Sequence, residues 1–163
     1  MGSGIRISCY NCGKYDVTLL TGIGFMYSPN AFNNPPSIKP NMWNIVKDKK
    51  ILKDVEMLIT EKKAKIFDDE IFGEKINYGM KIYYSEKEKR IYNLFDFSLS
   101  YLEDGKQKIY RAKYYDKYGE LLREINKEEL LDLEIKCPKC GEDISGFFIK
   151  EYFMWDWYDC LII

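Results

Sequence analysis

Two Cys-x-x-Cys pairs stand near opposite ends of this chain, and they constrain its fold more than any other feature. The pairs are Cys9 with Cys12 and Cys137 with Cys140, and a glycine follows each pair directly. Such a turn presents two sulfur atoms on one side of a tight loop, and the glycine allows the positive φ that the turn needs. Zn²⁺ binds four ligands in a tetrahedron, and the chain has no histidine that could complete either pair alone. We therefore expect one zinc site with all four cysteines as ligands.

The two pairs lie unusually far apart for a zinc ribbon. The halves of such a ribbon are commonly separated by about 15 to 20 residues, whereas 124 residues lie between Cys12 and Cys137. The sequence therefore predicts a ribbon built from the two ends of the chain, with the middle as an insertion. A cross-link that closes so long a loop has a large entropic benefit in principle. Four thiolates leave no coordination position for a substrate, which predicts a structural zinc.

The composition excludes several kinds of catalytic and metal site. The absence of histidine excludes Ser-His-Asp and Cys-His catalysis and all metal sites with histidine ligands. Lys and Arg number 25 and Asp and Glu 26, so the net charge of −1 does not favour a dedicated nucleic-acid binder. No apolar run has the length of a membrane span, and no signal-peptide core follows the N-terminus. We expect a cytoplasmic protein whose cysteine pairs bind metal and do not form disulfides.

The spacing of apolar residues predicts an α+β fold in one domain over residues 1–163. Knuckles with flanking strands are expected over 5–27 and 133–155. Between them, residues 42–132 form the inserted helix and antiparallel β-meander. The expected parts of this insertion are a helical stretch over 42–65 with a break near 47–50, strands over 80–85, 90–102 and 108–115, and a short helical segment over 126–132.

The cysteine motifs also carry a resemblance. Cys9-Tyr-Asn-Cys-Gly and Cys137-Pro-Lys-Cys-Gly resemble the knuckles of zinc-ribbon and rubredoxin-like proteins. The run Gly22-Ile-Gly-Phe-Met-Tyr-Ser-Pro29 is similar to a feature of small uncharacterised bacterial zinc-ribbon proteins. The resemblance covers about the first 30 residues and residues 133–150. It implies a metal-binding module without a known reaction.

Other candidate sites have weaker signals. The acidic run Asp68-Asp69-Glu70 offers ligands for a hard cation, but charge runs of this kind are usually solvated. Cys160 has no histidine to act as its base, and we expect an inert thiol there. Gly22 and Gly24 lack the rest of a phosphate-binding fingerprint. Residues 28–41 contain four of the five prolines and predict a long irregular loop.

The C-terminal segment 147–158 is the most aromatic part of the chain, with Phe147, Trp155 and Trp157 among its residues. Aromatic clusters can form hot spots of protein interfaces or stack on unpaired bases. They more often belong to the core, because large aromatic side chains dominate buried area.

A faint internal repeat relates the middle of the chain to the knuckles. Tyr115-Asp-Lys-Tyr-Gly119 follows the pattern of Cys137-Pro-Lys-Cys-Gly141 with tyrosine in place of cysteine, and residues 84–92 are similar to a strand–knuckle–strand segment. These matches suggest a second ribbon that has lost its metal, and chance agreement of common turn residues is the alternative. The hypothesis requires that residues 84–90 and 115–119 form turns that face each other.

Three functions fit these observations. The first is a zinc-stabilised binding or adaptor module, a class that includes inhibitors and regulators of other proteins. A protein is its expected partner, a nucleic acid is the alternative, and no membrane partner is expected. The second is electron transfer, because four thiolates also bind a single iron ion that changes its oxidation state. The third is an enzyme, which we do not expect because no spacing in the sequence places two catalytic side chains together.

Overall fold

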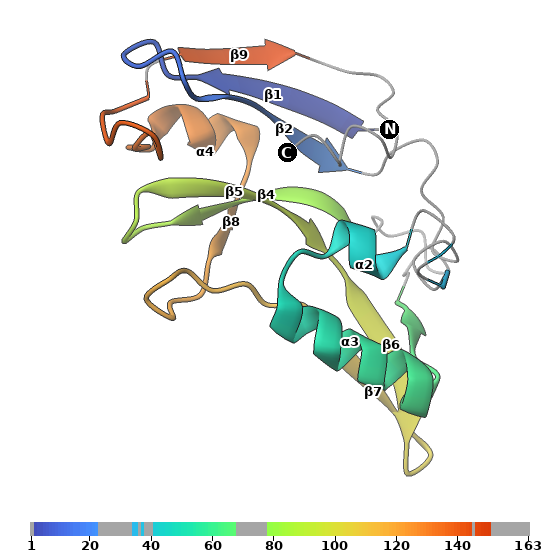
Figure 1. Ribbon diagram of the computed structural model, residues 1–163. Helices are drawn as coiled ribbons and strands as arrows, with labels where there is room; N and C mark the ends of the chain where they lie inside the picture. Colours follow the sequence, from blue (N-terminus) through green and yellow to red (C-terminus); the bar gives the residue numbers. More distant parts are fainter. Residues whose placement is uncertain are drawn as a thin grey trace.

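The computed structural model describes residues 2–22, 34–35, 37, 41–67, 78–144 and 146–150. Over these residues the protein is an α+β structure of antiparallel strands with few helices (Figure 1). Within these described residues, no helix is both long and apolar enough to cross a membrane. In chain order the elements are β1 (Gly2–Ser8), β2 (Asp16–Gly22), α2 (Met42–Ile45), α3 (Lys49–Lys62), β3 (Lys65–Ile66), β4 (Gly79–Ser85), β5 (Arg90–Asp96), β6 (Ser98–Glu103), β7 (Lys106–Arg111), β8 (Arg123–Ile125), α4 (Lys127–Asp132) and β9 (Gly146–Lys150).

The larger sheet divides into two parts. Its strand order is β5-β4-β2-β1-β9. β8 also pairs with β4, at residues 82–84, next to Met80, where β2 pairs with β4. β2 and β4 pair at one position, Gly22 opposite Met80. We call β9, β1 and β2 the first unit, and β5, β4 and β8 the second unit. Figure 1 shows the first unit stacked above the second, with α4 between them at one end.

The smaller sheet, β3-β6-β7, carries α3 on one face (Figure 1). Helical spacing places Ile51, Val55 and Leu58 on the buried side of α3. The Asp48 carboxylate accepts hydrogen bonds from the N–H groups of Lys50 and Ile51, at 2.9 and 3.0 Å, and so caps this helix at its N-terminus. The helical stretch predicted over 42–65 is confirmed for α2 and α3, which separate at 46–48, close to the predicted break; it ends at Lys62, and residues 65–66 form β3 instead.

Two clusters of buried side chains hold these parts together. One packs α3 and the small sheet against the second unit and includes Val55 and Phe97, both 0% exposed. The other packs the first unit against the second and includes Ile7 and Tyr84. The Tyr84 hydroxyl also donates to the C=O of Glu134 at 2.7 Å. Because each such side chain contributes about 1.5–3 kcal/mol when fully buried, the second cluster is what keeps the two units stacked.

The strands predicted as one β-meander belong to two different sheets. The strand predicted over 90–102 is β5 followed by β6, and the two meet at Phe97. Phe97 is buried and lies outside both ladders, so β5 remains in the large sheet while β6 enters the small one. The strand predicted over 108–115 ends at Arg111. β8 has three residues, too few for a periodicity, and the prediction missed it.

The remaining predicted elements agree with the structure where it describes them. β4 confirms the strand over 80–85, and α4 confirms the helical segment over 126–132. β9, at 146–150, is the strand expected after the second knuckle within 133–155, and residues 151–155 lie outside the described residues.

Candidate metal centre

Each Cys-x-x-Cys pair lies in a tight turn that two backbone hydrogen bonds close. In the first turn the N–H of Gly13 donates to the C=O of Cys9 at 2.9 Å, and the N–H of Cys9 donates to the C=O of Tyr15 at 2.8 Å. The second turn, residues 137–142, has the corresponding two bonds at 2.9 and 2.8 Å. Gly13 and Gly141 have φ values of +62° and +79°, which side chains with a Cβ rarely adopt. This explains why glycine follows both cysteine pairs.

The two turns bring four sulfur atoms together. The Sγ atoms of Cys9, Cys12, Cys137 and Cys140 all lie within 4.8 Å of one another, so the group could hold a metal ion. Cys9 and Cys140 are 3.6 Å apart at Sγ, and Cys12 and Cys137 are 3.8 Å apart. Zn–S bonds of about 2.3 Å in a tetrahedron place the sulfurs about 3.8 Å apart. The structure therefore brings together all four predicted ligands at distances that suit four-thiolate coordination.

The four thiols differ in their access to solvent. Cys9 and Cys137, the first cysteine of each turn, are both 1% exposed. Cys12 is partly buried, and Cys140 is exposed. One edge of the site is therefore open to solvent, while the other is continuous with the cluster that packs the two units together.

Backbone N–H groups point at two of the sulfurs. The N–H of Lys139 donates to Sγ of Cys137 at 3.3 Å, and the N–H of Lys14 donates to Sγ of Cys12 at 3.4 Å. Burial disfavours ionisation of Cys137, but the N–H groups of Lys139 and Cys140 and the neighbouring thiols outweigh it and lower its pKa to about 7. The N–H of Glu142 lowers the pKa of Cys140, but desolvation and hydrogen bonds with the other three thiols outweigh it and raise that pKa to about 12. A thiolate is the form that binds metal, so the geometry favours the ligand form at Cys137, and metal binding has to release the proton of Cys140.

Strand pairing sets the two turns side by side. β1 pairs with β2 up to Ser8 opposite Asp16, and with β9 up to Ser8 opposite Gly146. Cys9 follows Ser8 directly and the second turn leads into β9 at Gly146, so both turns lie at the same end of the first unit. A Cβ on Gly146 would lie 2.8 Å from the C=O of Ser8 and 2.6 Å from the Tyr10 ring. Only glycine fits there, and this lets the end of the chain pass close to the first knuckle.

Several predicted features lie outside the described residues. They are the acidic run 68–70, Cys160, Gly24 and the aromatic residues from 151 onward. Most of the loop predicted over 28–41 is outside them as well. Gly22 is described, and it ends β2 with φ +84° opposite Met80.

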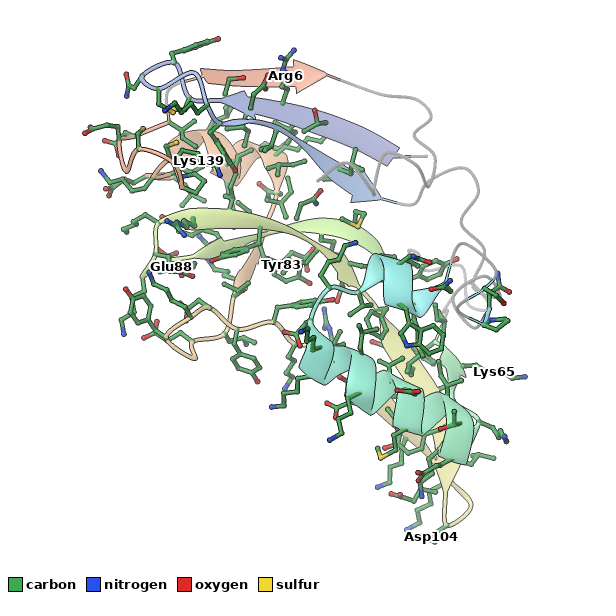
Figure 2. The ribbon with its side chains drawn as sticks, in the orientation of Figure 1. Arg6, Lys65, Tyr83, Glu88, Asp104 and Lys139 are labelled. Atoms are coloured by element: carbon green, nitrogen blue, oxygen red, sulfur yellow. The ribbon has the colours of Figure 1, made fainter. Side chains whose placement is uncertain are left out.

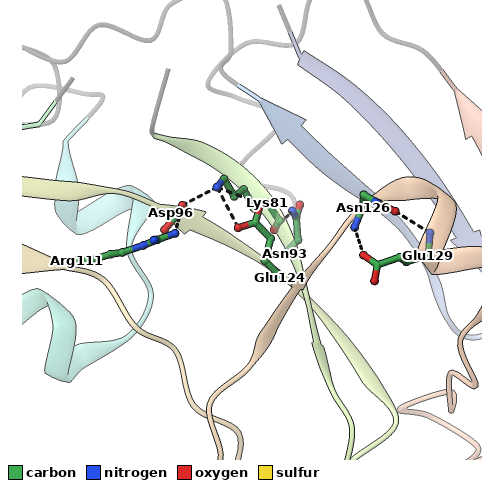
Figure 3. Close-up of polar contacts among 7 residues, drawn as sticks. All are labelled: Lys81, Asn93, Asp96, Arg111, Glu124, Asn126 and Glu129. Atoms are coloured by element: carbon green, nitrogen blue, oxygen red, sulfur yellow. Dashed lines mark hydrogen bonds and ion pairs between the residues drawn. The ribbon is translucent and has the colours of Figure 1, made fainter. Parts of the chain in front are cut away.

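A polar cluster between the second unit and β7 of the smaller sheet had no signal in the sequence (Figure 3). The Asp96 side chain is 3% exposed and lies 2.8 Å from Lys81 and 3.6 Å from Arg111, and Lys81 also contacts Glu124 at 3.1 Å. Burial lowers the pKa of Lys81, but the ion pairs with Asp96 and Glu124 raise it overall. The residues come from β4, β5, β7 and β8, so only the folded chain brings them together. Opposite charges offset each other here, and the cluster fixes the strands relative to one another.

No protein-family model, curated protein or solved structure matches this chain. What the site does is therefore inferred from the geometry of the four thiols and from the packing around them.

Proposed function

We propose that this chain is a zinc-stabilised binding module in which one Zn²⁺ ion joins the two ends of the chain. The observation that carries the proposal is the convergence of four Sγ atoms within 4.8 Å from turns that 124 residues separate. Four thiolates fill the tetrahedron, so the metal has no position for a substrate or a reactive water. Its role is to stabilise the first unit, and the module itself carries out no catalysis.

An exposed apolar group on the turn after β7 supports a protein partner. Tyr115, Tyr118 and Leu121 are 54%, 54% and 60% exposed, and Tyr115 lies opposite Leu121 in a β-bridge. The Nζ atoms of Lys87 and Lys117 lie 4.9 and 5.0 Å from the centre of the Tyr118 ring. Tyrosines with an apolar body and a polar tip are frequent anchors of protein interfaces. We place the partner-binding surface of the module on this turn.

Electron transfer by a single iron ion is the second candidate. The same four thiolates bind iron, and hydrogen bonds to the sulfurs together with solvent exposure set the potential of iron–thiolate centres. The N–H donors to Cys12 and Cys137 and the exposed edge at Cys140 are the features that favour this reading.

Metal content and an absorption spectrum distinguish the two candidates. Protein purified from medium that contains both metals should carry one zinc per chain and no visible absorption. One iron per chain with thiolate charge-transfer bands would instead establish the second candidate. Cys140→Ser should lower both the metal content and the melting temperature, because metal binding is coupled to folding. Lys139→Ser, in the same turn, is the matched control and should bind metal as wild type does.

The proposed binding surface has a separate test. Tyr118→Ser and Leu121→Ser should keep the metal content and the melting temperature of wild type, because both side chains are largely exposed. A partner that cross-links to the wild-type chain should be lost from both variants. Equal cross-linking by the variants would remove this turn from the interface.

A further inference from the structure

Two turns of the second unit face each other, as the hypothesis of an internal repeat requires. They are the turn between β4 and β5, residues 86–89, and the turn 116–120 that precedes β8. The Ser85 hydroxyl at the end of β4 donates to the Asp116 carboxylate at 2.8 Å, and the two residues are 2% and 9% exposed. Two ion pairs cross between the same turns, Lys87 with Glu120 at 3.0 Å and Lys117 with Glu88 at 3.8 Å. The prediction that these segments form facing turns is therefore confirmed.

The turn 116–120 reproduces the hydrogen bonds of the knuckle 137–142. In both, the N–H of the first residue donates to the C=O of the glutamate that ends the turn, and the N–H of the glycine donates to the C=O of the first residue. The distances are 2.8 and 3.0 Å in the turn 116–120, and 2.8 and 2.9 Å in the knuckle. Gly119 and Gly141 have φ values of +80° and +79°. This match places Asp116, and not Tyr115, at the position of Cys137, with the turn one residue shorter than the knuckle.

The β4–β5 turn corresponds to the first knuckle in the same way. Lys89 lies four residues after Ser85, as Gly13 lies four residues after Cys9, and their φ values are +54° and +62°. A non-glycine residue at positive φ is uncommon, so Lys89 marks a backbone shape that this turn shares with the knuckle. Ser85 then stands at the position of Cys9.

The strands around the turns follow one plan in both units. In the first unit the hairpin β1–β2 is completed by β9, which follows the second knuckle and pairs antiparallel with β1. In the second unit the hairpin β4–β5 is completed by β8, which follows the turn 116–120 and pairs antiparallel with β4. Figure 2 shows Lys139 in the second knuckle and Glu88 in the β4–β5 turn at the same end of the molecule.

We propose that the second unit is a second ribbon, in which hydrogen bonds centred on Asp116 replace the metal. The Asp116 carboxylate accepts the Ser85 hydroxyl and the N–H groups of Tyr118 and Glu120, the latter two at 2.9 Å each. Glu88, at the position of Cys12, has a side chain that is 2% exposed and accepts the Tyr92 hydroxyl at 2.7 Å. These hydrogen bonds, with the Lys117 ammonium beside Glu88, satisfy the carboxylates without a metal ion. The second ribbon therefore stays folded when the metal leaves, and only the first unit opens.

Hydrogen exchange before and after metal removal tests this independence. After a chelator has removed the metal, the amides of β1 and β2 should lose protection, while those of β4 and β5 keep theirs. Ser85→Ala should lower the protection of β4 and β5 and leave the metal content at the wild-type value. Loss of protection in all four strands together on chelation would overturn the proposal.

Grafting the chain's own knuckle onto the second unit tests the structural equivalence. The variant carries Ser85→Cys and Glu88→Cys, and residues 116–120 are replaced by the sequence of residues 137–142. We expect it to bind one zinc ion more per chain than wild type in the same measurement. A folded graft with the wild-type zinc content would overturn the equivalence. If the graft does not fold, the hydrogen-exchange experiment above is the test of the proposal. Wild type without zinc would refute the proposed function alone, because the graft is scored by its difference from wild type.

Discussion

Replacing Asn93 should weaken the contact between the two units at the point where their strands diverge, while the buried cluster between them remains. Asn93 lies on β5 (Figure 3), and its amide nitrogen donates to the C=O groups of Leu20 and Lys81 at 2.7 and 3.0 Å. Its amide oxygen accepts the N–H of Leu20 at 2.7 Å. Leu20 lies on β2, whose ladder with β4 has one residue pair. The side-chain amide therefore satisfies the Leu20 backbone groups that a neighbouring strand would otherwise satisfy.

The structure sets the size of the effect. Asn93→Leu keeps the volume of the side chain and removes all three hydrogen bonds. Leu20 is 3% exposed, so its N–H and C=O groups would be left buried and unpaired. Each such group costs about 1–3 kcal/mol, and we expect Asn93→Leu to lower the free energy of unfolding by about 3 kcal/mol. For a chain of this length that is a fall in melting temperature of about 6–12 °C.

Urea and thermal unfolding of the metal-loaded protein measure this change. Gln107→Leu is the matched control, because it makes the same kind of replacement on an exposed strand and should change stability by no more than about 0.5 kcal/mol. Asn93→Leu should also keep the wild-type metal content, since it leaves the four thiols in place. If Asn93→Leu and Gln107→Leu unfold at the same urea concentration, the Asn93 amide does not connect the units and the reasoning fails.

Three further predictions follow from single residues. Val55→Ala removes two buried methyl groups from α3 and should cost about 2 kcal/mol in a urea titration; a loss below about 0.5 kcal/mol would show that this core is loosely packed. Gly119→Ala should cost about 1–2 kcal/mol because φ is +80° there, and Gly119→Asn should cost less. Burial raises the pKa of Asp116, but hydrogen bonds to its carboxylate outweigh it and lower the pKa below 3.8. The ionised carboxylate therefore stabilises the fold above pH 3.8, and this stabilisation is lost as the pH falls through the lowered pKa. In metal-free protein, Asp116→Asn should therefore reduce the loss of unfolding free energy when the pH is lowered below about 4. The same loss in Asp116→Asn and wild type would count against this.

Local patterns in the sequence were enough for the elements that depend on neighbouring residues. The apolar spacing over 42–65 gave α3, and Asp48 is a preferred capping residue at the predicted break. The β4–β5 hairpin was also predicted, because runs rich in Tyr and Ile flank a polar turn. In each case the residues that decide the structure lie within a few positions of one another.

Elements that depend on distant residues could not be predicted in this way. Phe97 divides β5 from β6 because its side chain is buried among residues from other elements, and nothing in the run 90–102 marks that position. Asn93 reads as an ordinary polar residue in a strand, yet its amide holds the backbone of Leu20. Partners of this kind become visible only when the chain is folded.

The sequence by itself determined which four sulfur atoms are candidates to bind a metal. Two Cys-x-x-Cys pairs, each followed by glycine, in a chain without histidine leave one economical ligand set. The tertiary structure decided where that set forms and what surrounds it. β1 pairs with both β2 and β9, and this closes a loop of 124 residues onto one site, with Cys9 buried and Cys140 exposed. The tertiary structure also decided that the two turns of the second unit are joined by a hydrogen bond from Ser85 to the Asp116 carboxylate. These residues are 31 positions apart, so the bond exists only after the strands have paired.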